Sequence, residues 1–149
     1  GDTSLPDVHA DGLALSPGGE WLYYRALTGT GLWRVRTRFL RDASLGPRHL
    51  AESVEYFGKV GVADGMAFGP EGWLYLTDLD DRAITRTRPF APLQTVTQDP
   101  RIAWPGSIAF GPGGSLLFTT SRIHEGSVPQ GPCRIFRLPP PVEPAADTQ

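Results

Sequence analysis

The chain has 149 residues, including 18 Gly and 15 Pro, and its net charge is −2. Gly and Pro are nearly twice as frequent as their usual share of about 12%, which excludes long helices. The small negative charge provides no basic field for nucleic acid or an anionic membrane, and no apolar run approaches the about 18 residues that span a bilayer. We therefore expect a soluble, turn-rich chain with neither of these partners.

The single cysteine, Cys133, excludes an intrachain disulfide framework and a cysteine-based zinc site. It precedes Arg134-Ile135-Phe136 in a strand-like context, where a lone cysteine is typically a small buried apolar residue. The length indicates one domain. Four Trp, four Tyr and seven Phe together with frequent turns favour many short strands.

Three segments of the chain share one pattern. They begin at Asp11, Asp64 and Gly106, with offsets of 53 residues (11 to 64) and 42 residues (64 to 106). Each reads Asp or Gly, small, apolar, Ala, apolar, small, Pro, any residue and Gly, followed by an apolar stretch. Only Glu20 has to be treated as an insertion. This repetition is the sequence signature of a repeat architecture.

Each repeat predicts a β-hairpin, because Pro-x-Gly suits a tight turn between two apolar runs. The first run of each repeat is nearly all apolar, as in strands that are buried on both faces. These inner strands are predicted over residues 13–15, 66–68 and 108–110. The second strands are predicted over residues 21–25, 73–78 and 115–120.

A third strand follows in each repeat, over residues 31–37, 83–88 and 133–138. The first two alternate apolar or small residues with Arg, as half-exposed strands do. A fourth, outermost strand is predicted over 93–97. Repeats of three or four strands that recur every 42 to 53 residues are typical of propeller blades. We therefore predict an all-β chain with three blades, over 8–52, 53–100 and 101–138. The Pro-rich residues 139–149 are predicted to form a disordered tail.

These repeats resemble the yellow/major royal jelly protein family, including its bacterial members. The resemblance rests on residues 11–17, 63–68, 74–79 and 134–138, and on Trp104-Pro105 before Ser107-Ile108. The family's fold is a six-bladed β-propeller, so the chain is expected to form half of a ring. The other half would come from further residues of a longer chain or from a second copy of this one. The resemblance also implies a secreted or periplasmic protein.

The start of each innermost strand faces the central channel in a propeller, and Asp11 and Asp64 hold this position in two repeats. Two carboxylates around one axis suit Ca²⁺ or another divalent cation. A more distant resemblance to the regucalcin/gluconolactonase family implies the same, since Asp64-Gly-Met matches one of its metal-binding segments and Asp11-Gly-Leu matches another with Asp in place of Asn. Asp-Gly is also common turn chemistry, and Gly106 supplies no carboxylate in the third repeat.

Trp104 and Ser107 flank the start of the third inner strand and are the predicted ligand-binding residues. The Trp104 indole is placed to stack on an aromatic or cationic ligand at the channel mouth, or to form a buried contact between blades. No Gly-x-Ser-x-Gly elbow surrounds Ser107, so nothing indicates a serine hydrolase. His124 lies in a loop and pairs with no other His at metal-ligand spacing.

Three functions remain open, and no catalytic residue is identified. The first is a yellow/major royal jelly-like propeller that binds a small organic ligand, with or without a divalent cation, at the central channel. The second is a metal-dependent lactonase-type hydrolase resembling gluconolactonase, in which the cation would polarise a lactone carbonyl. The third is a non-catalytic structural or interaction module.

Overall fold

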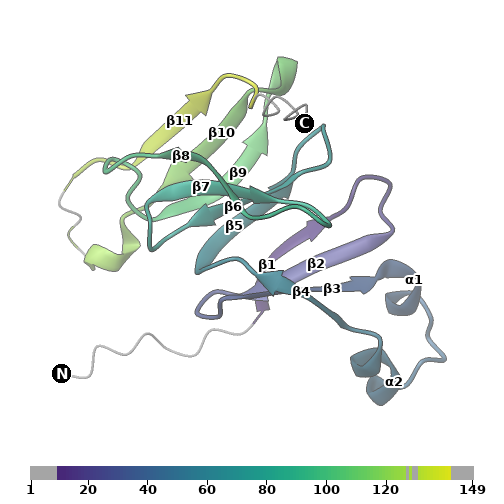
Figure 1. Ribbon diagram of the computed structural model, residues 1–149. Helices are drawn as coiled ribbons and strands as arrows, with labels where there is room; N and C mark the ends of the chain where they lie inside the picture. Colours follow the sequence, from purple (N-terminus) through teal and green to yellow (C-terminus); the bar gives the residue numbers. More distant parts are fainter. Residues whose placement is uncertain (1–9, 127, 129–130, 142–149) are drawn as a thin grey trace.

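The computed structural model describes residues 10–126, 128 and 131–141; the rest of the predicted tail, 142–149, lies outside the described residues. Three antiparallel sheets follow one another along the chain (Figure 1). The first contains β1 (Ala10–Leu15), β2 (Trp21–Ala26), β3 (Gly31–Arg36) and β4 (Glu55–Lys59). The second contains β5 (Ala63–Phe68), β6 (Leu74–Asp78), β7 (Ala83–Thr87) and β8 (Gln94–Gln98). The third contains β9 (Pro105–Phe110), β10 (Leu116–Thr120) and β11 (Arg134–Leu138).

The three sheets are three blades of a β-propeller, as predicted. Within each sheet the strands pair in chain order, and the first strands lie side by side, β1 against β5 and β5 against β9. The helices are short: α1 (Thr37–Leu40), α2 (Pro47–Glu52) and the 3₁₀ turns η1 (Pro112–Gly114) and η2 (Ile123–Glu125). In the part of the chain that the structure describes, no helix is long and apolar enough to cross a membrane.

The first sheet extends further than its repeat suggests. Its outer strand β4 pairs with β3 and ends at Lys59. The boundary at residues 52 and 53 therefore divides this sheet. Helices α1 and α2 separate β3 from β4 in the chain, and the β4 sequence has no counterpart in the alternating pattern of the other outer strands.

Each innermost strand contains a β-bulge at the same position of its repeat. In β1 the pairing passes from Ala10 opposite Ala26 to Leu13 opposite Tyr24, so two residues oppose one. The second and third sheets show the same shift. A bulge bends its strand and redirects the side chains next to it. The bulged residues and their single opposing residue are 11–12 with Arg25, 64–65 with Thr77, and 106–107 with Thr119.

The core consists of two apolar clusters, one on each side of the middle sheet. The first joins Leu32 of the first sheet to Leu76 of the second, and the second joins Ile84 to Phe118 of the third. Among the described residues, therefore, only the middle sheet is covered by a sheet on both sides. In β1 the expected burial on both faces is wrong, because Leu13 is 59% exposed and none of the described sheets covers its side of the blade.

The alternating strand of the second repeat, β7, is buried along its whole length instead of half-exposed. The strand lies between β6 and β8, and its Ile84 packs in the cluster shared with the third sheet. Its Arg86 is only 4% exposed, with its guanidinium 4.4 Å from the centre of the Trp73 ring. Arg86 also donates hydrogen bonds to the Tyr75 hydroxyl (3.3 Å) and to Gln94 (3.1 Å). Stacking and hydrogen bonding on all sides make a buried arginine tolerable here.

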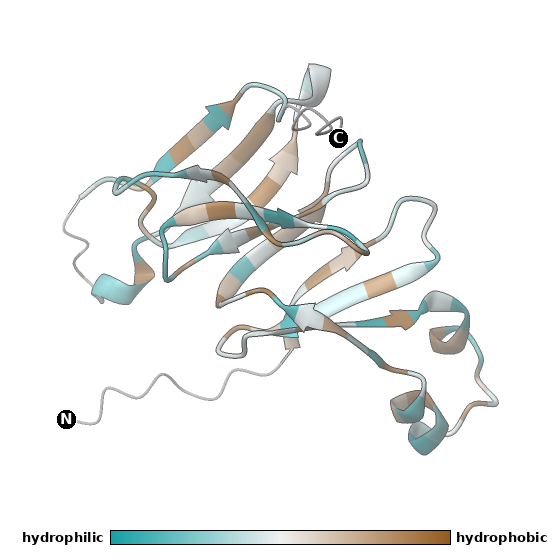
Figure 2. Cartoon of the chain, viewed as in Figure 1, coloured by the Kyte–Doolittle hydropathy of each residue, from teal (hydrophilic) through white to brown (hydrophobic). Residues whose placement is uncertain are grey.

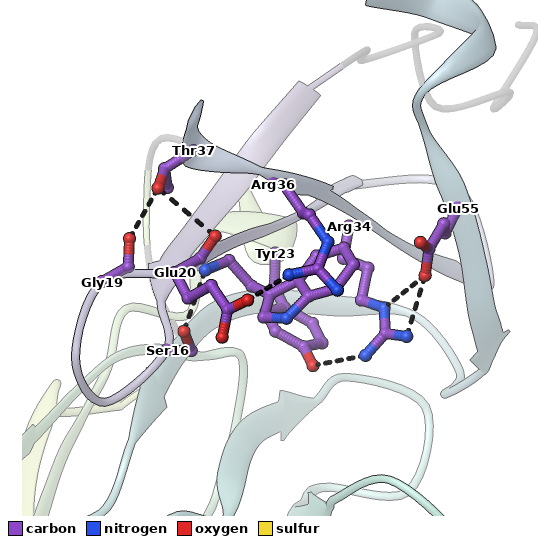
Figure 3. A network of polar contacts seen from close by, with 9 residues as sticks. Ser16, Gly19, Glu20, Tyr23, Arg34, Arg36, Thr37 and Glu55 are labelled. Atoms are coloured by element: carbon purple, nitrogen blue, oxygen red, sulfur yellow. Dashed lines mark hydrogen bonds and ion pairs between the residues drawn. The ribbon is translucent and has the colours of Figure 1, made fainter. Parts of the chain in front are cut away.

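The first sheet repeats this arrangement in a more exposed form (Figure 3). Arg34 lies 4.1 Å from the Trp21 ring centre and donates to the Tyr23 hydroxyl at 3.3 Å. Its remaining donors reach the Glu55 carboxylate on β4, at 2.9 and 2.8 Å. The repeat therefore includes the packing of Arg on Trp and Tyr as well as the hairpin.

Cys133 is exposed, so the prediction that it is buried is wrong. It lies just before β11, and its thiol donates to the Ser121 carbonyl at 3.3 Å. Strand β11 is the last one of the third sheet, which has a neighbouring sheet on one side only among the described residues.

Candidate functional site at the channel end of the inner strands

Asp64 is fixed from two sides. The Thr77 hydroxyl oxygen accepts hydrogen bonds from the backbone N–H groups of Asp64 (3.1 Å) and Gly65 (2.8 Å), which holds the bulge. The Asp64 carboxylate accepts a hydrogen bond of 2.9 Å from the indole N–H of Trp104. Two of the residues predicted from sequence, one as a metal ligand and one as a ligand-binding residue, are therefore in direct contact.

Trp104 has a left-handed backbone conformation, with φ of 49°. For a bulky L-residue this costs about 1–2 kcal/mol, and such strain is typical of functional positions. The Trp104 carbonyl accepts a hydrogen bond from Ser121 N–H at 3.1 Å, which fixes the backbone. The His124 ring stacks on the indole, with ring centres 5.5 Å apart and planes 12° apart.

The loop that carries His124 is held by an ion pair. Arg122 donates two hydrogen bonds to the Glu125 carboxylate, at 2.9 and 2.6 Å. Arg122 is itself in the left-handed region, with φ of 56°. The bidentate pair closes the short η2 turn and so positions His124 over Trp104.

A cleft of about 280 Å³ opens beside the stacked pair. It combines two aromatic rings, one carboxylate and one guanidinium with aliphatic side chains. Its volume lies just below the about 300–1,000 Å³ of typical ligand pockets, so it suits a small molecule. The lining residues are Val62, Leu79, Asp80, Arg82, Trp104 and His124.

The pKa of Asp64 is raised. Burial is the largest cause, and the nearby charge of Asp11 adds to it, while the hydrogen bond from Trp104 opposes the shift. The first and second sheets thus bring the two predicted carboxylates within electrostatic reach of each other. Asp11 itself is exposed.

The glycines of the bulges allow the inner strands to approach closely. A Cβ at Gly12 would lie 3.1 Å from the Asp64 carbonyl oxygen, and one at Gly65 would overlap the carbonyl oxygen of Gly106. A Cβ at Gly106 would lie 3.7 Å from the Asp64 carboxylate. Position 106 therefore faces Asp64, but glycine offers no ligand there.

Arg25 is the residue that sequence reasoning missed. It opposes the first bulge, where the other two sheets have Thr77 and Thr119. Its side chain is fully buried and donates to the carbonyl oxygens of Ala26 and Gly29, but its Nη1 atom has no hydrogen-bond partner in the described part of the chain. Aligning the repeats would have revealed this exchange of Thr for Arg.

The described residues do not by themselves assemble a divalent-cation site. Burial lowers the pKa of Arg25, and the charges of Asp78 and Asp11 partly offset that effect. The Arg25 guanidinium therefore interacts with the carboxylates that a cation at the channel end would need. One Asp64 oxygen is engaged by the Trp104 indole, and Gly106 contributes nothing. Within the described residues, no three His, Cys, Asp or Glu side chains come together to hold a metal ion.

Ser107 lies apart from the cleft. It is exposed, and its N–H donates to the Thr119 hydroxyl at 3.2 Å. Its equivalents Gly12 and Gly65 face the following sheet. Ser107 therefore faces the side of the third sheet that no other described sheet covers.

The sequence profile described as "Major royal jelly protein" matches residues 4–105, which is more than half of the chain. The chain belongs to the major royal jelly protein family. The match covers the first two sheets and ends at the first residue of β9. A comparison with curated proteins gives no significant match.

Solved structures support the same fold. A gluconolactonase from Xanthomonas campestris is 16% identical, with a TM-score of 0.66 over 90% of this chain. A luciferin-regenerating enzyme is 18% identical, with a TM-score of 0.60 over 88% of this chain. A calcium-binding protein, regucalcin, from Agrobacterium tumefaciens is 22% identical, with a TM-score of 0.58 over 87% of this chain. In each case this family member spans 45% of the other chain, so it is about half as long as these neighbours.

Proposed function

We propose that this chain binds a small organic ligand in the cleft beside Trp104, at the channel end of a propeller. One observation carries the proposal: an indole in a left-handed backbone conformation, fixed by Asp64 and stacked on His124, lines a cleft of ligand size. A structural role alone would not require an aromatic pair to border an open cleft.

The cleft favours a ligand that has a planar or cationic part. The Trp104 and His124 rings offer stacking surfaces, and a cation near an indole gains about 0.5–2 kcal/mol. Asp80 and Arg82 on the cleft wall supply one charge of each sign, which would orient a small polar molecule. Aromatic amines are therefore the first class to test.

The test is calorimetric titration of the chain with a panel of small aromatic amines. Trp104→Ala is expected to weaken binding of any amine found by about tenfold or more, the loss expected for a stacking anchor. Phe90→Ala is the matched control, because Phe90 is a fully exposed aromatic residue that does not line this cleft. Equal affinity of Trp104→Ala and the wild-type chain would contradict the proposal.

The lactonase alternative is tested in parallel, by adding lactones with and without Ca²⁺ and following ring opening. Its support is the shared fold with a gluconolactonase, whereas Arg25 and Gly106 favour binding without metal-assisted hydrolysis. Cation-dependent lactone opening would reverse this preference. Absence of binding to both panels would favour the structural-module alternative. A secreted or periplasmic location remains a prediction from the family resemblance.

A further inference from the structure

A second cleft, which we call the outer cleft, lies between the first two sheets at their outer strands. It is lined by Arg34, by the end of β4 (residues 56–60), and by the end of β7 with the loop after it (residues 87–91 and 93). Its volume is about 320 Å³, within the about 300–1,000 Å³ that small-molecule sites occupy. Hydrophilic and hydrophobic residues both occur on the strands that border it, β4 and β7 (Figure 2). Both walls are adjacent sheets of this chain.

The charged residues that line the outer cleft are all basic. They are Arg34, Lys59 and Arg88, and none of the described Asp or Glu residues lines it. One carboxylate lies close by, because Glu55 accepts a hydrogen bond of 2.9 Å from Arg34. Three basic groups against one acid leave a local surplus of positive charge in a chain whose net charge is −2. A basic concave surface attracts anions, so the outer cleft favours a negatively charged ligand.

Two of the three basic groups are held on tryptophan rings. The Arg34 guanidinium lies 4.1 Å from the centre of the Trp21 ring, and that of Arg88 lies 4.1 Å from the centre of the Trp73 ring. The contacts of Arg34 within the first sheet use three of its five N–H groups, which leaves two in the described part of the chain. Lys59, the only lysine of the sequence, is exposed. The positive charge of the cleft is therefore largely fixed in place before any ligand arrives.

An aromatic residue in a strained conformation stands at the rim of the outer cleft. Phe90 is fully exposed and left-handed, with φ of 64°. The turn that carries it is closed by a hydrogen bond of 3.1 Å from Ala91 N–H to the Arg88 carbonyl, and Pro89 and Pro92 restrict it further. Burial of the ring cannot explain this conformation, and such strain is typical of functional positions. The rim therefore presents a fixed aromatic surface beside the basic wall.

We propose that the outer cleft binds a small organic anion with an aromatic part, such as an aromatic carboxylate. The carboxylate would accept charge-assisted hydrogen bonds from the basic wall, and the ring would pack against Phe90. Stacked arginines and a proline-restricted turn lose little freedom on binding, which favours affinity. The outer cleft shares no lining residue with the cleft beside Trp104, so this inference and the proposed function can fail independently.

The test is calorimetric titration of the chain with phenylacetate, compared with neutral phenylacetamide and with inorganic phosphate. Phenylacetate is expected to bind about tenfold more tightly than either, and its affinity should fall as the salt concentration rises. Lys59→Gln and Arg88→Gln should each weaken phenylacetate binding by about fivefold or more, because each removes one positive charge from the wall. Both residues are exposed, so circular dichroism should show folded variants. Arg48→Gln is the matched control, an exposed arginine that does not line the outer cleft.

Two further variants locate the ligand. Phe90→Ala should weaken phenylacetate binding and leave phosphate binding unchanged, whereas Trp104→Ala should change neither, because Trp104 belongs to the other cleft. Absence of saturable phenylacetate binding, or equal affinity of the wild-type chain and both charge variants, would overturn the inference. Loss of phenylacetate binding in Trp104→Ala would also overturn it, by placing the anion in the other cleft. Phosphate binding as tight as phenylacetate binding would overturn the assigned ligand class.

Discussion

Trp104 and Asp64 lie forty positions apart in the sequence yet form one unit at the channel end. The pKa of the Asp64 carboxylate is set by opposing effects: burial and the charge of Asp11 raise it, and the hydrogen bond from the indole N–H lowers it. Both neighbours come from other strands or loops. The ionisation of Asp64 therefore reports whether the three inner strands keep their spacing.

Replacing either neighbour should move the pKa of Asp64 in a known direction. Trp104→Phe removes a donor to the charged form and is expected to raise it further, whereas Asp11→Asn removes a like charge and is expected to lower it. Carboxyl-carbon NMR titration measures both. Asp99 is an internal reference, since Arg101 holds its pKa at about 2 and neither substitution reaches it. Shifts of the same sign in both variants would contradict the assignment.

The raised pKa also has a consequence for stability. Folded Asp64 binds its proton more tightly than the unfolded chain does, so its favourable contribution is complete below its unfolded pKa and is lost as the pH rises through the folded value. Asp64→Asn, which keeps an acceptor for the indole, should flatten this fall in urea unfolding measured at several pH values. An unchanged slope would indicate that other groups, such as Asp78, dominate it.

Arg25 is expected to suppress cation binding. The double variant Arg25→Thr, Gly106→Asp removes a buried positive charge and adds a carboxylate facing Asp64. It should bind Ca²⁺ at least about tenfold more tightly than the wild-type chain, and Ca²⁺ should raise its melting temperature. Arg101→Thr serves as the control, because Arg101 is exposed and paired with Asp99. Equal Ca²⁺ affinity of wild type and double variant would show that Arg25 does not set this preference.

At the scale of elements, the repeated hairpins were predictable because Pro-x-Gly turns and apolar runs recur with fixed spacing. Strand β4 was not, since it lies beyond two short helices and has no repeat signature. The burial of β7 was not predictable either. Alternation of Arg with Thr and Ile indicates exposure only if the arginines lack partners, and Arg86 has Trp73 and Tyr75.

The Arg86 packing should contribute measurably to stability. Arg86→Met keeps the aliphatic stem but removes the charge over Trp73 and the hydrogen bond to Tyr75, so a loss of about 1–2 kcal/mol is expected in urea unfolding. Arg88→Met is the matched control, because Arg88 also lies over Trp73 but is exposed. Its loss should stay below about 0.5 kcal/mol. Equal losses for the two variants would mean that burial of the arginine is irrelevant.

For the whole molecule, the number of blades followed from the repeats, whereas the half-ring length followed from the family resemblance. The repeats did not show which of two equivalent side chains is exposed. Leu13 and Met66 are both apolar and hold the same position in their repeats, but only Met66 is covered by a neighbouring sheet in the described residues. Likewise, Asp11 and Asp64 could be assigned to the channel by repeat position. The contact with Trp104 and the cleft depend on loop geometry, which a repeat pattern does not encode.

The exposed thiol of Cys133 makes the chain a natural single-site reporter. It is the only cysteine in the sequence and lies beside the last strand of the third sheet. A spin label or fluorophore attached there needs no background substitution.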